Sequence, residues 1–460
     1  MNKKSVLILG ICTYSILLLG AVLFYKERTV FLDIAYHLFS ILKDQNFAIQ
    51  NSRFGAMATQ AFPLLASKMG CSLNTIAVLY SCSFIILYAS TFFTLLLIQK
   101  NTRIALSYLI FGIIITAHTF YWAQSELPQA AAFLFLYLGY LDNTLSKGLK
   151  ASYWLWTSML LLLVCFTHPL MIFAVTFSMA FLAITYREKW KTIAISFSIY
   201  FVFVLFKAIF FRTNYDTQAL GGLKNIIALF PNLINLTSNK NLLQYLFYDY
   251  YLLLIGFIAV NFFYIKNKMF LKFVLVNCFC FGYTFIVNIT YPRGSDQFYL
   301  ENQYLLLGMF VALPLTIDIL PSIKMKPLVI AIVAGGLIVS LIRIYETHKM
   351  YTARLNWNRE LLKSTKHLPR KKLIVRTDNM PYHVLLKTWG SCYEFWLLST
   401  MEENESRSII IERPDFEFGW AIKEDKKFIT PWGIFAYSEF HNQYFKFHDS
   451  TAYEYYVLPK

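Results

Sequence analysis

The sequence contains little charge for its length. Only 15% of its 460 residues are Asp, Glu, Lys or Arg, whereas soluble domains contain about 25%. Hydrophobic residues make up 57% of the chain. This balance excludes an ordinary cytosolic enzyme and is typical of a protein that is embedded in a membrane.

Other absences narrow the function further. The seven cysteines form no CxxC pair or zinc-type spacing and mostly lie in apolar runs, so neither a disulfide framework nor a metal cluster is indicated. The chain has no GxGxxG or GxxxxGK loop for a nucleotide. Residues 1–345 hold 25 Lys and Arg against 11 Asp and Glu. We attribute this excess to membrane orientation and not to nucleic-acid binding.

Apolar runs of membrane-crossing length occur along most of the chain. The first run, at 5–25, follows Lys3 and Lys4 and has no clear small-residue cleavage site, which favours a signal anchor with a cytoplasmic N-terminus over a signal peptide. We predict an α-helical polytopic membrane protein with about eleven transmembrane helices. The runs are 5–25, 75–98, 104–123, 128–141, 152–167, 170–186, 192–211, 246–265, 270–290, 303–320 and 327–345.

The charges of the connections support this count. Alternate connections are short, and each carries at least two Lys or Arg, as the positive-inside rule expects of cytoplasmic turns. The other connections and the C-terminal tail then lie outside the cytoplasm. We therefore predict a multi-pass protein of the cell (inner) membrane. The basic connections are 99–103, 142–151, 187–191, 266–269 and 321–326.

Residues 346–460 differ in pattern from the transmembrane domain at 1–345. An amphipathic helix at 348–368 continues the last apolar run, and short β-rich runs follow, with a helix at 393–401 among them. We predict a small C-terminal extracytoplasmic α/β domain. Its expected strands are 372–376, 408–412, 434–437, 444–447 and 453–458.

Acidic residues on the outer side are candidates for catalysis. Asp33, Tyr36 and His37 are spaced i, i+3 and i+4, so they share the polar face of an amphipathic helix after the first run. Glu126 follows the third run in a connection too short to let it move freely into solvent. The residues alone leave two other interpretations open: an ordinary surface helix for Asp33, and helix capping ahead of Pro128 for Glu126.

Further polar residues on the same side form a candidate binding region. Arg293, Asp296 and Glu301 lie close together before the tenth run, a mixture suited to a phosphate and to hydroxyl groups. Arg53 lies in the first outer connection, and His168 in a tight outer turn. An anionic lipid head group is a partner that fits these cations, while snorkelling and surface pairing explain them equally well.

The order of these features resembles the GT-C superfamily of membrane glycosyltransferases, which includes protein O-mannosyltransferases and aminoarabinose transferases. Asp33 matches the acid after the first span, and Glu126 matches the acid between spans three and four. The segments DIAYH at 33–37, NSRFG at 51–55 and QAFPL at 60–64 are similar to the first outer loop of the mannosyltransferase-like branch. The chain has Leu-Asp-Ile where many members have paired acids, so dependence on a divalent metal is left open. The WWD-type motif of oligosaccharyltransferases is absent.

The resemblance implies a membrane glycosyltransferase that moves a sugar from a polyprenyl-phosphate carrier to a glycan, lipid or protein acceptor at the non-cytoplasmic face. Asp33 would act as the base, and Glu126 would orient the acceptor or hold a metal. Two alternatives are a transporter or flippase and a polymerase or ligase of surface polysaccharide; mostly clean spans favour an enzyme over a transporter. The resemblance implies His37 as a further catalytic residue and Arg53, Tyr36, His168, Arg293, Asp296 and Glu301 as substrate-binding residues.

Overall fold

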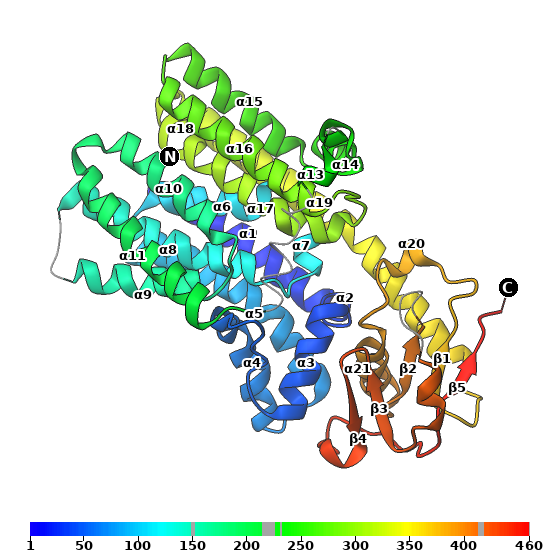
Figure 1. Cartoon of the computed structure of the whole chain (residues 1–460). Helices are drawn as coiled ribbons and strands as arrows, with labels where there is room; N and C mark the ends of the chain where they lie inside the picture. Colours follow the sequence, from blue (N-terminus) through cyan, green and yellow to red (C-terminus); the bar gives the residue numbers. More distant parts are fainter. Residues whose placement is uncertain (149–151, 214–225, 231, 413–417, 460) are drawn as a thin grey trace.

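The computed structural model describes residues 1–148, 152–213, 226–230, 232–412 and 418–459. Parts of the connections 142–151 and 212–245, which the sequence analysis predicted to be cytoplasmic and outer respectively, lie outside the described residues. Figure 1 shows a bundle of helices and, beside it, a small α/β unit. The long helix α19 (Lys326–Ser364) runs from the bundle into this unit, and it contains both the last apolar run and most of the amphipathic helix expected after it.

The helical part is that of a membrane protein, although the count of eleven spans is not confirmed. In the part of the chain that the structure describes, six helices are long and apolar enough to cross a membrane, or seven if the bent pair α14 and α15 is one span. Each predicted run lies largely in a helix, but several helices have only 13 to 15 residues. At 1.5 Å per residue these extend roughly 20–23 Å, less than a hydrocarbon core of about 30 Å.

The bounds of the helices from residue 1 to residue 322 follow the predicted runs with the changes described below. They are α1 (Lys3–Leu23), α2 (Tyr25–Thr29), α3 (Leu32–Asp44), α4 (Met57–Lys68), α5 (Leu73–Phe93), α6 (Thr102–Ile114), α7 (His118–Tyr121), α8 (Glu126–Lys147), α9 (Tyr153–Cys165), α10 (Met171–Thr185), α11 (Trp190–Phe210), α13 (Ile226–Leu229), α14 (Thr237–Tyr248), α15 (Tyr251–Lys266), α16 (Phe270–Thr290), α17 (Gln297–Pro314) and α18 (Leu320–Ser322).

The third apolar run, predicted as one span at 104–123, does not form one continuous helix. Helix α6 ends at Ile114, and the short helix α7 follows as a separate turn. A carboxylate oxygen of Glu301, on α17, accepts hydrogen bonds from the backbone N–H groups of Ala117 and Thr119, at 2.7 Å each. These bonds satisfy donors at the start of α7 and therefore stabilise the break.

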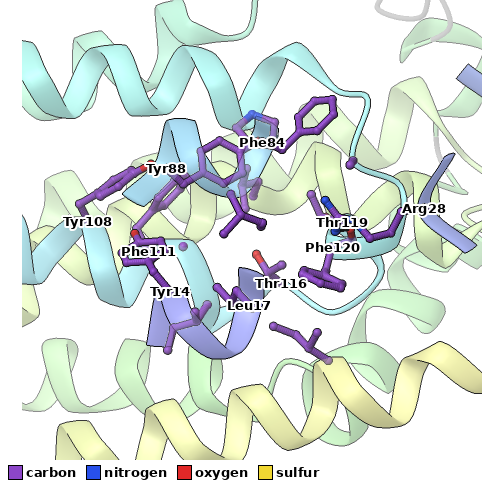
Figure 2. Close-up of a pocket in the computed structure, with 17 residues that line it drawn as sticks. Tyr14, Leu17, Arg28, Phe84, Tyr88, Tyr108, Phe111, Thr116, Thr119 and Phe120 are labelled. Atoms are coloured by element: carbon purple, nitrogen blue, oxygen red, sulfur yellow. Dashed lines mark hydrogen bonds between the residues drawn. The ribbon is translucent and has the colours of Figure 1, made fainter. Parts of the chain in front are cut away.

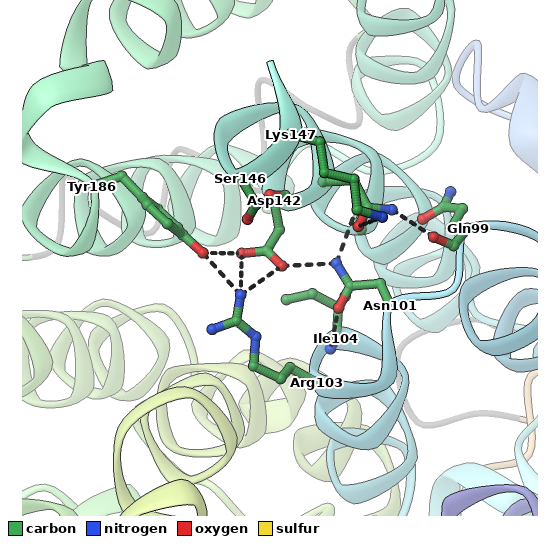
Figure 3. Close-up of polar contacts among 10 residues, drawn as sticks. Gln99, Asn101, Arg103, Ile104, Asp142, Ser146, Lys147 and Tyr186 are labelled. Atoms are coloured by element: carbon green, nitrogen blue, oxygen red, sulfur yellow. Dashed lines mark hydrogen bonds and ion pairs between the residues drawn. The ribbon is translucent and has the colours of Figure 1, made fainter. Parts of the chain in front are cut away.

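A buried acid joins the start of α6 to the end of α8 and of α10. Asp142 accepts hydrogen bonds from Asn101 Nδ2 at 2.8 Å, from the Tyr186 hydroxyl at 2.6 Å and from Arg103 Nη2 at 3.2 Å (Figure 3). Both carboxylate oxygens of Asp142 are therefore used. Buried polar groups with all partners present fix the packing of neighbouring helices, so we assign this network a structural role.

The α/β unit contains most of the strands that the sequence predicts. Its three-stranded parallel sheet has the order β2-β1-β5, and a separate antiparallel hairpin pairs β3 with β4. Helix α21 packs on β2 and forms the crossover between β1 and β2. The elements are β1 (Lys372–Val375), α20 (Tyr382–Leu385), α21 (Ser391–Glu403), β2 (Ser408–Ile411), β3 (Lys427–Thr430), β4 (Gly433–Ala436) and β5 (Glu454–Tyr456).

Two details of this unit differ from the prediction. The sequence analysis missed β3, and the strand predicted at 444–447 does not form. That segment instead packs by its side chains: the ring of Phe445 stacks on Trp396 with 4.8 Å between centroids. The aromatic pattern of this segment therefore suggested a strand, but in the structure its rings fill the core of the α/β unit.

The α/β unit is fixed to helix α3. The Phe39 ring on α3 lies 5.0–5.8 Å from six aromatic rings of the unit, those of Tyr393, Trp396, Phe428, Phe435, Phe440 and Phe445. At the other end of α3, the Leu32 N–H donates to Glu394 Oε1 at 2.8 Å. Glu394 is buried and pairs with the buried Arg354 on α19 at 2.7 Å. Helix α3 is therefore held between the bundle and the unit, which rules out a free surface helix.

Candidate functional site

Asp33 and Glu126 come from different connections and lie in one region. Asp33 is in the first turn of α3, and Glu126 is the first residue of α8. Trp122, in the connection before α8, donates a hydrogen bond from Nε1 to Asp33 Oδ2 at 2.8 Å. The negative charge of Glu126 is close enough to raise the pKa of Asp33. The structure thus places the two predicted acids together.

The surroundings of Asp33 suit proton transfer at neutral pH. Burial is the main cause that raises the pKa of Asp33 to about 7, and the charge of Glu126 adds to it. The hydrogen bond from Trp122 and the charge of Arg53 act in the opposite direction. The residue as a whole is of intermediate exposure. A general base is most effective when its pKa lies near the working pH, and Asp33 meets this condition.

Arg53 holds the second acid in place. Its Nη1 lies 2.8 Å from Glu126 Oε2, and both side chains are largely buried. The loop that carries Arg53 is pressed against the turn before α10, because a Cβ atom at Gly55 would lie only 2.0 Å from the Thr167 hydroxyl. Only glycine fits such an approach without displacing its neighbour. Close packing against Thr167 therefore explains the glycine at position 55 of the NSRFG segment.

The two predicted histidines support loops near the acids. His37 is buried, and its Nδ1 lies 3.2 Å from the Ala48 carbonyl, in a loop that Gln60 also binds. Burial lowers the pKa of His37. His168 accepts the Leu170 N–H through Nδ1 at 3.2 Å, and burial and the charge of Arg53 lower its pKa well below the usual value. Both rings are therefore neutral at physiological pH and shape the loops around Arg53 and Asp33.

A solvent-accessible pocket lies beside the acid pair, where residues 290–300 meet the α/β unit. It encloses about 690 Å³, including its mouth. Arg293 is exposed here, and Asp296 pairs with Lys387 of the α/β unit at 2.8 Å. The lining residues are Thr290, Tyr291, Pro292, Arg293, Gly294, Ser295, Asp296, Tyr299, Leu300 and Lys387.

Lys387 is a site residue that the sequence analysis missed. It is separated from Asp296 by about ninety positions and lies among many other charged residues of the tail, so no local pattern distinguishes it. Glu301, by contrast, was predicted to bind substrate but does not line this pocket. Its carboxylate is buried against the start of α7, as described above. The pocket therefore brings together Arg293 and Asp296 without Glu301.

Trp122 connects the two parts of the site. Its indole N–H binds Asp33, while its ring lies 5.2 Å from the ring of Tyr299, which lines the Arg293 pocket. The ring of Phe298 contacts Trp122 from a third direction at 5.5 Å. The acid pair and the Arg293 pocket are therefore linked through the adjacent rings of Trp122 and Tyr299. We define the candidate site as these two regions together.

An apolar pocket lies inside the helix bundle, beside the residues that connect α6 to α8. It contains about 660 Å³ of space, including its mouth, and Figure 2 shows Arg28 and Thr119 at one end and the rings of Tyr88 and Tyr108 at the other. Arg28 is buried and donates to the backbone carbonyls of Ser81 and Phe120, so its guanidinium already has partners within the protein. The full lining is Tyr14, Leu17, Arg28, Phe84, Ile85, Tyr88, Tyr108, Phe111, Gly112, Ile113, Thr116, Thr119, Phe120, Ala123, Pro128, Leu305 and Ile344.

No family model, curated protein or solved structure matches this chain. The resemblance to GT-C enzymes thus remains a prediction from the sequence motifs. Within the described residues, no group of three or more His, Cys, Asp or Glu side chains is arranged to hold a metal ion. The function is therefore argued from the chemistry of the site itself.

Proposed function

We propose that this protein is a membrane glycosyltransferase that moves a sugar from a polyprenyl-phosphate carrier to the hydroxyl group of an acceptor. The observation that carries the proposal is the contact, through Trp122, between the Asp33–Glu126 pair and the pocket lined by Arg293 and Lys387. Such a reaction needs a base for the acceptor and cations for the departing phosphate, and these two groups of residues offer both.

In the proposed step, the acceptor oxygen attacks the anomeric carbon of the donor sugar. Asp33 takes the proton of that hydroxyl, and the bond between the anomeric carbon and the phosphate oxygen breaks. The electron pair of this bond remains on the polyprenyl phosphate, whose charge Arg293 and Lys387 stabilise. Glu126, held by Arg53, orients the acceptor and favours the protonated form of Asp33 after transfer.

A lipid-borne donor also agrees with the proposed topology. We propose that α8 and the shorter apolar helices α6, α9 and α10 cross the bilayer together with the six long helices and the bent pair α14 and α15, giving eleven crossings. The basic connections then face the cytoplasm, and the candidate site and the α/β unit lie on the other side. The exposed Arg293 would be on the face where Lys and Arg are usually depleted, which supports a role in binding an anionic head group.

The test compares Asp33→Asn with Asp44→Asn in the same helix. Asp44 is 54% exposed and pairs with Lys43, so it is a matched control. Wild type and both variants are reconstituted in proteoliposomes with a panel of radiolabelled polyprenyl-phosphate sugars and a membrane extract as acceptor. Loss of one general base lowers rates by about 10²–10⁴-fold. We therefore expect Asp33→Asn to abolish detectable donor consumption and Asp44→Asn to retain it.

One result would reject the role of Asp33, and another would reject the proposed function. Near-full transfer by Asp33→Asn would assign the base to another residue, and Glu126 would be the next candidate. Movement of intact carrier lipid across the vesicle bilayer, with no sugar transferred by the wild type, would favour a flippase instead. Quantifying intact donor and free polyprenyl phosphate by thin-layer chromatography separates these outcomes.

A further inference from the structure

Three aromatic side chains gather beside Asp33 at the border with the α/β unit. Trp432 lies in the turn of the β3–β4 hairpin and is 58% exposed. Its ring centroid is 5.1 Å from that of Tyr36 on α3 and 4.6 Å from that of Trp389, just before α21. We call Tyr36, Trp389 and Trp432 the aromatic platform. The reaction proposed above does not use it.

The turn that carries the exposed indole is held firmly. The backbone N–H of Trp432 donates to the Thr430 hydroxyl at 3.3 Å, which fixes this turn. In the strands of the same hairpin, the rings of Phe428 and Phe435 pack against Phe39 on α3. The hairpin is thus anchored to the helix that carries Asp33 (Figure 1). A ring that is already immobilised loses little entropy when a ligand binds to it.

The Trp432 ring is only partly covered by its neighbours. The buried Tyr393 lies nearly parallel to it, with 6.3 Å between centroids and an angle of 23°. Tyr36 meets the indole at 78° and Trp389 at 51°. With these three rings in place, 58% of Trp432 remains exposed. Large aromatic rings that are rigid and exposed are typical anchors for a ligand.

The platform is close to the reacting carboxyl. Tyr36 is three residues after Asp33, or about 4.5 Å along the helix axis. Trp389 is adjacent to Gly390, which packs against the start of α3 so closely that a Cβ atom there would lie 2.9 Å from Leu32 Cα. The platform therefore borders the place where an acceptor hydroxyl would meet Asp33.

We infer that the aromatic platform binds a sugar ring of a glycan acceptor. A pyranose has a face of C–H groups that packs on an indole, and its hydroxyl groups remain at the edge, where water or ionised groups reach them. A hydrocarbon chain in this position would instead border Asp33 and the nearby Asp296–Lys387 pair, and dehydrating such groups is costly. The inference rests on the proposed function and specifies the acceptor class as a carbohydrate.

The test measures binding, not transfer. The full-length protein in nanodiscs is titrated with maltotriose, cellotriose, chitotriose and mannotriose, and intrinsic fluorescence and calorimetry record binding. The variants are Trp432→Ala, Trp432→Phe and, as a control, Trp420→Ala. Trp420 is 43% exposed on the same unit, where its ring contacts Phe418.

We expect at least one trisaccharide to bind the wild type and Trp432→Ala to weaken this binding about tenfold or more, as removal of an aromatic anchor does. Trp432→Phe should retain most of the affinity, and Trp420→Ala all of it. No binding to the wild type, or equal binding to Trp432→Ala, would overturn the inference. So would quenching of the Trp432 fluorescence by brominated nanodisc lipids, since the ring would then lie in the bilayer.

The outcomes keep the two proposals apart. If no trisaccharide binds but donor consumption still depends on Asp33, the glycosyltransferase assignment stands and the platform is rejected. If a trisaccharide binds through Trp432 but no donor is consumed, the platform stands as a carbohydrate site and the transferase assignment is rejected.

Discussion

Replacing Asp33 by Asn should make the protein more stable at neutral pH while it removes activity. The wild-type carboxyl has a folded-state pKa of about 7 against an ordinary value of 3.8. Between about pH 4 and pH 7 the folded state therefore binds more protons at this position than the unfolded state does. Under this condition stability falls as the pH rises. Asn does not titrate, so it is free of this loss.

The size of the effect follows from the pKa difference. Each pKa unit corresponds to 1.36 kcal/mol, so about three units set a limit of about 4 kcal/mol above pH 7. Asp33 is partly exposed, and solvent screening reduces the effect. We therefore expect Asp33→Asn to gain about 1–2 kcal/mol over the wild type at pH 8. The Asn carbonyl can still accept the Trp122 hydrogen bond, so the substitution removes the charge and keeps the contact.

The assay is thermal unfolding in nanodiscs, followed by intrinsic fluorescence between pH 5 and pH 8. The difference in melting temperature between Asp33→Asn and the wild type should widen as the pH rises to about 7 and then remain constant. Asp44→Asn should show no such trend, because Asp44 is exposed beside Lys43. A pH-independent difference, or a variant less stable than the wild type at pH 8, would refute the burial of an ionisable Asp33.

Three further predictions concern other parts of the molecule. Glu394→Gln leaves the buried Arg354 without its counter-charge and should lower the free energy of unfolding by about 3 kcal/mol. The same change at Glu402, in a more accessible ion pair, should lower it by less than about 1 kcal/mol. Equal losses would contradict the anchoring of the α/β unit through Glu394. Arg293→Lys should weaken use of the donor, so that transfer needs a higher donor concentration, and Arg293→Ala should weaken it more. Transfer measured against donor concentration checks this, and an unchanged curve for both variants would mean that Arg293 does not bind the donor phosphate. A reporter that is active only in the cytoplasm should remain silent when it is fused after Lys460, and a signal from it would remove the proposed outer location of the tail.

The sequence by itself determined the helical class and the positions of most elements. Apolar runs bounded by Lys and Arg need only local composition to be recognised, and each described run lies largely in a helix. Four of the five strands in the tail and the helix α21 followed from short β-rich and helical patterns. The spacing of Asp33, Tyr36 and His37 indicated one polar helix face, but it did not distinguish a surface helix from a buried one. The packing of Phe39 against the α/β unit made that distinction.

Only the tertiary structure decided which residues meet at the site. Glu301 caps the start of α7 and so interrupts a run whose hydropathy alone is continuous. Lys387 reaches the Arg293 pocket, and Trp432 reaches Tyr36, from segments far away in the sequence. Local periodicity predicts only which face of its own helix or strand a residue occupies. The residues that set a pKa, form an ion pair or determine the exposure of a ring come from other segments, and their positions depend on how the whole chain packs.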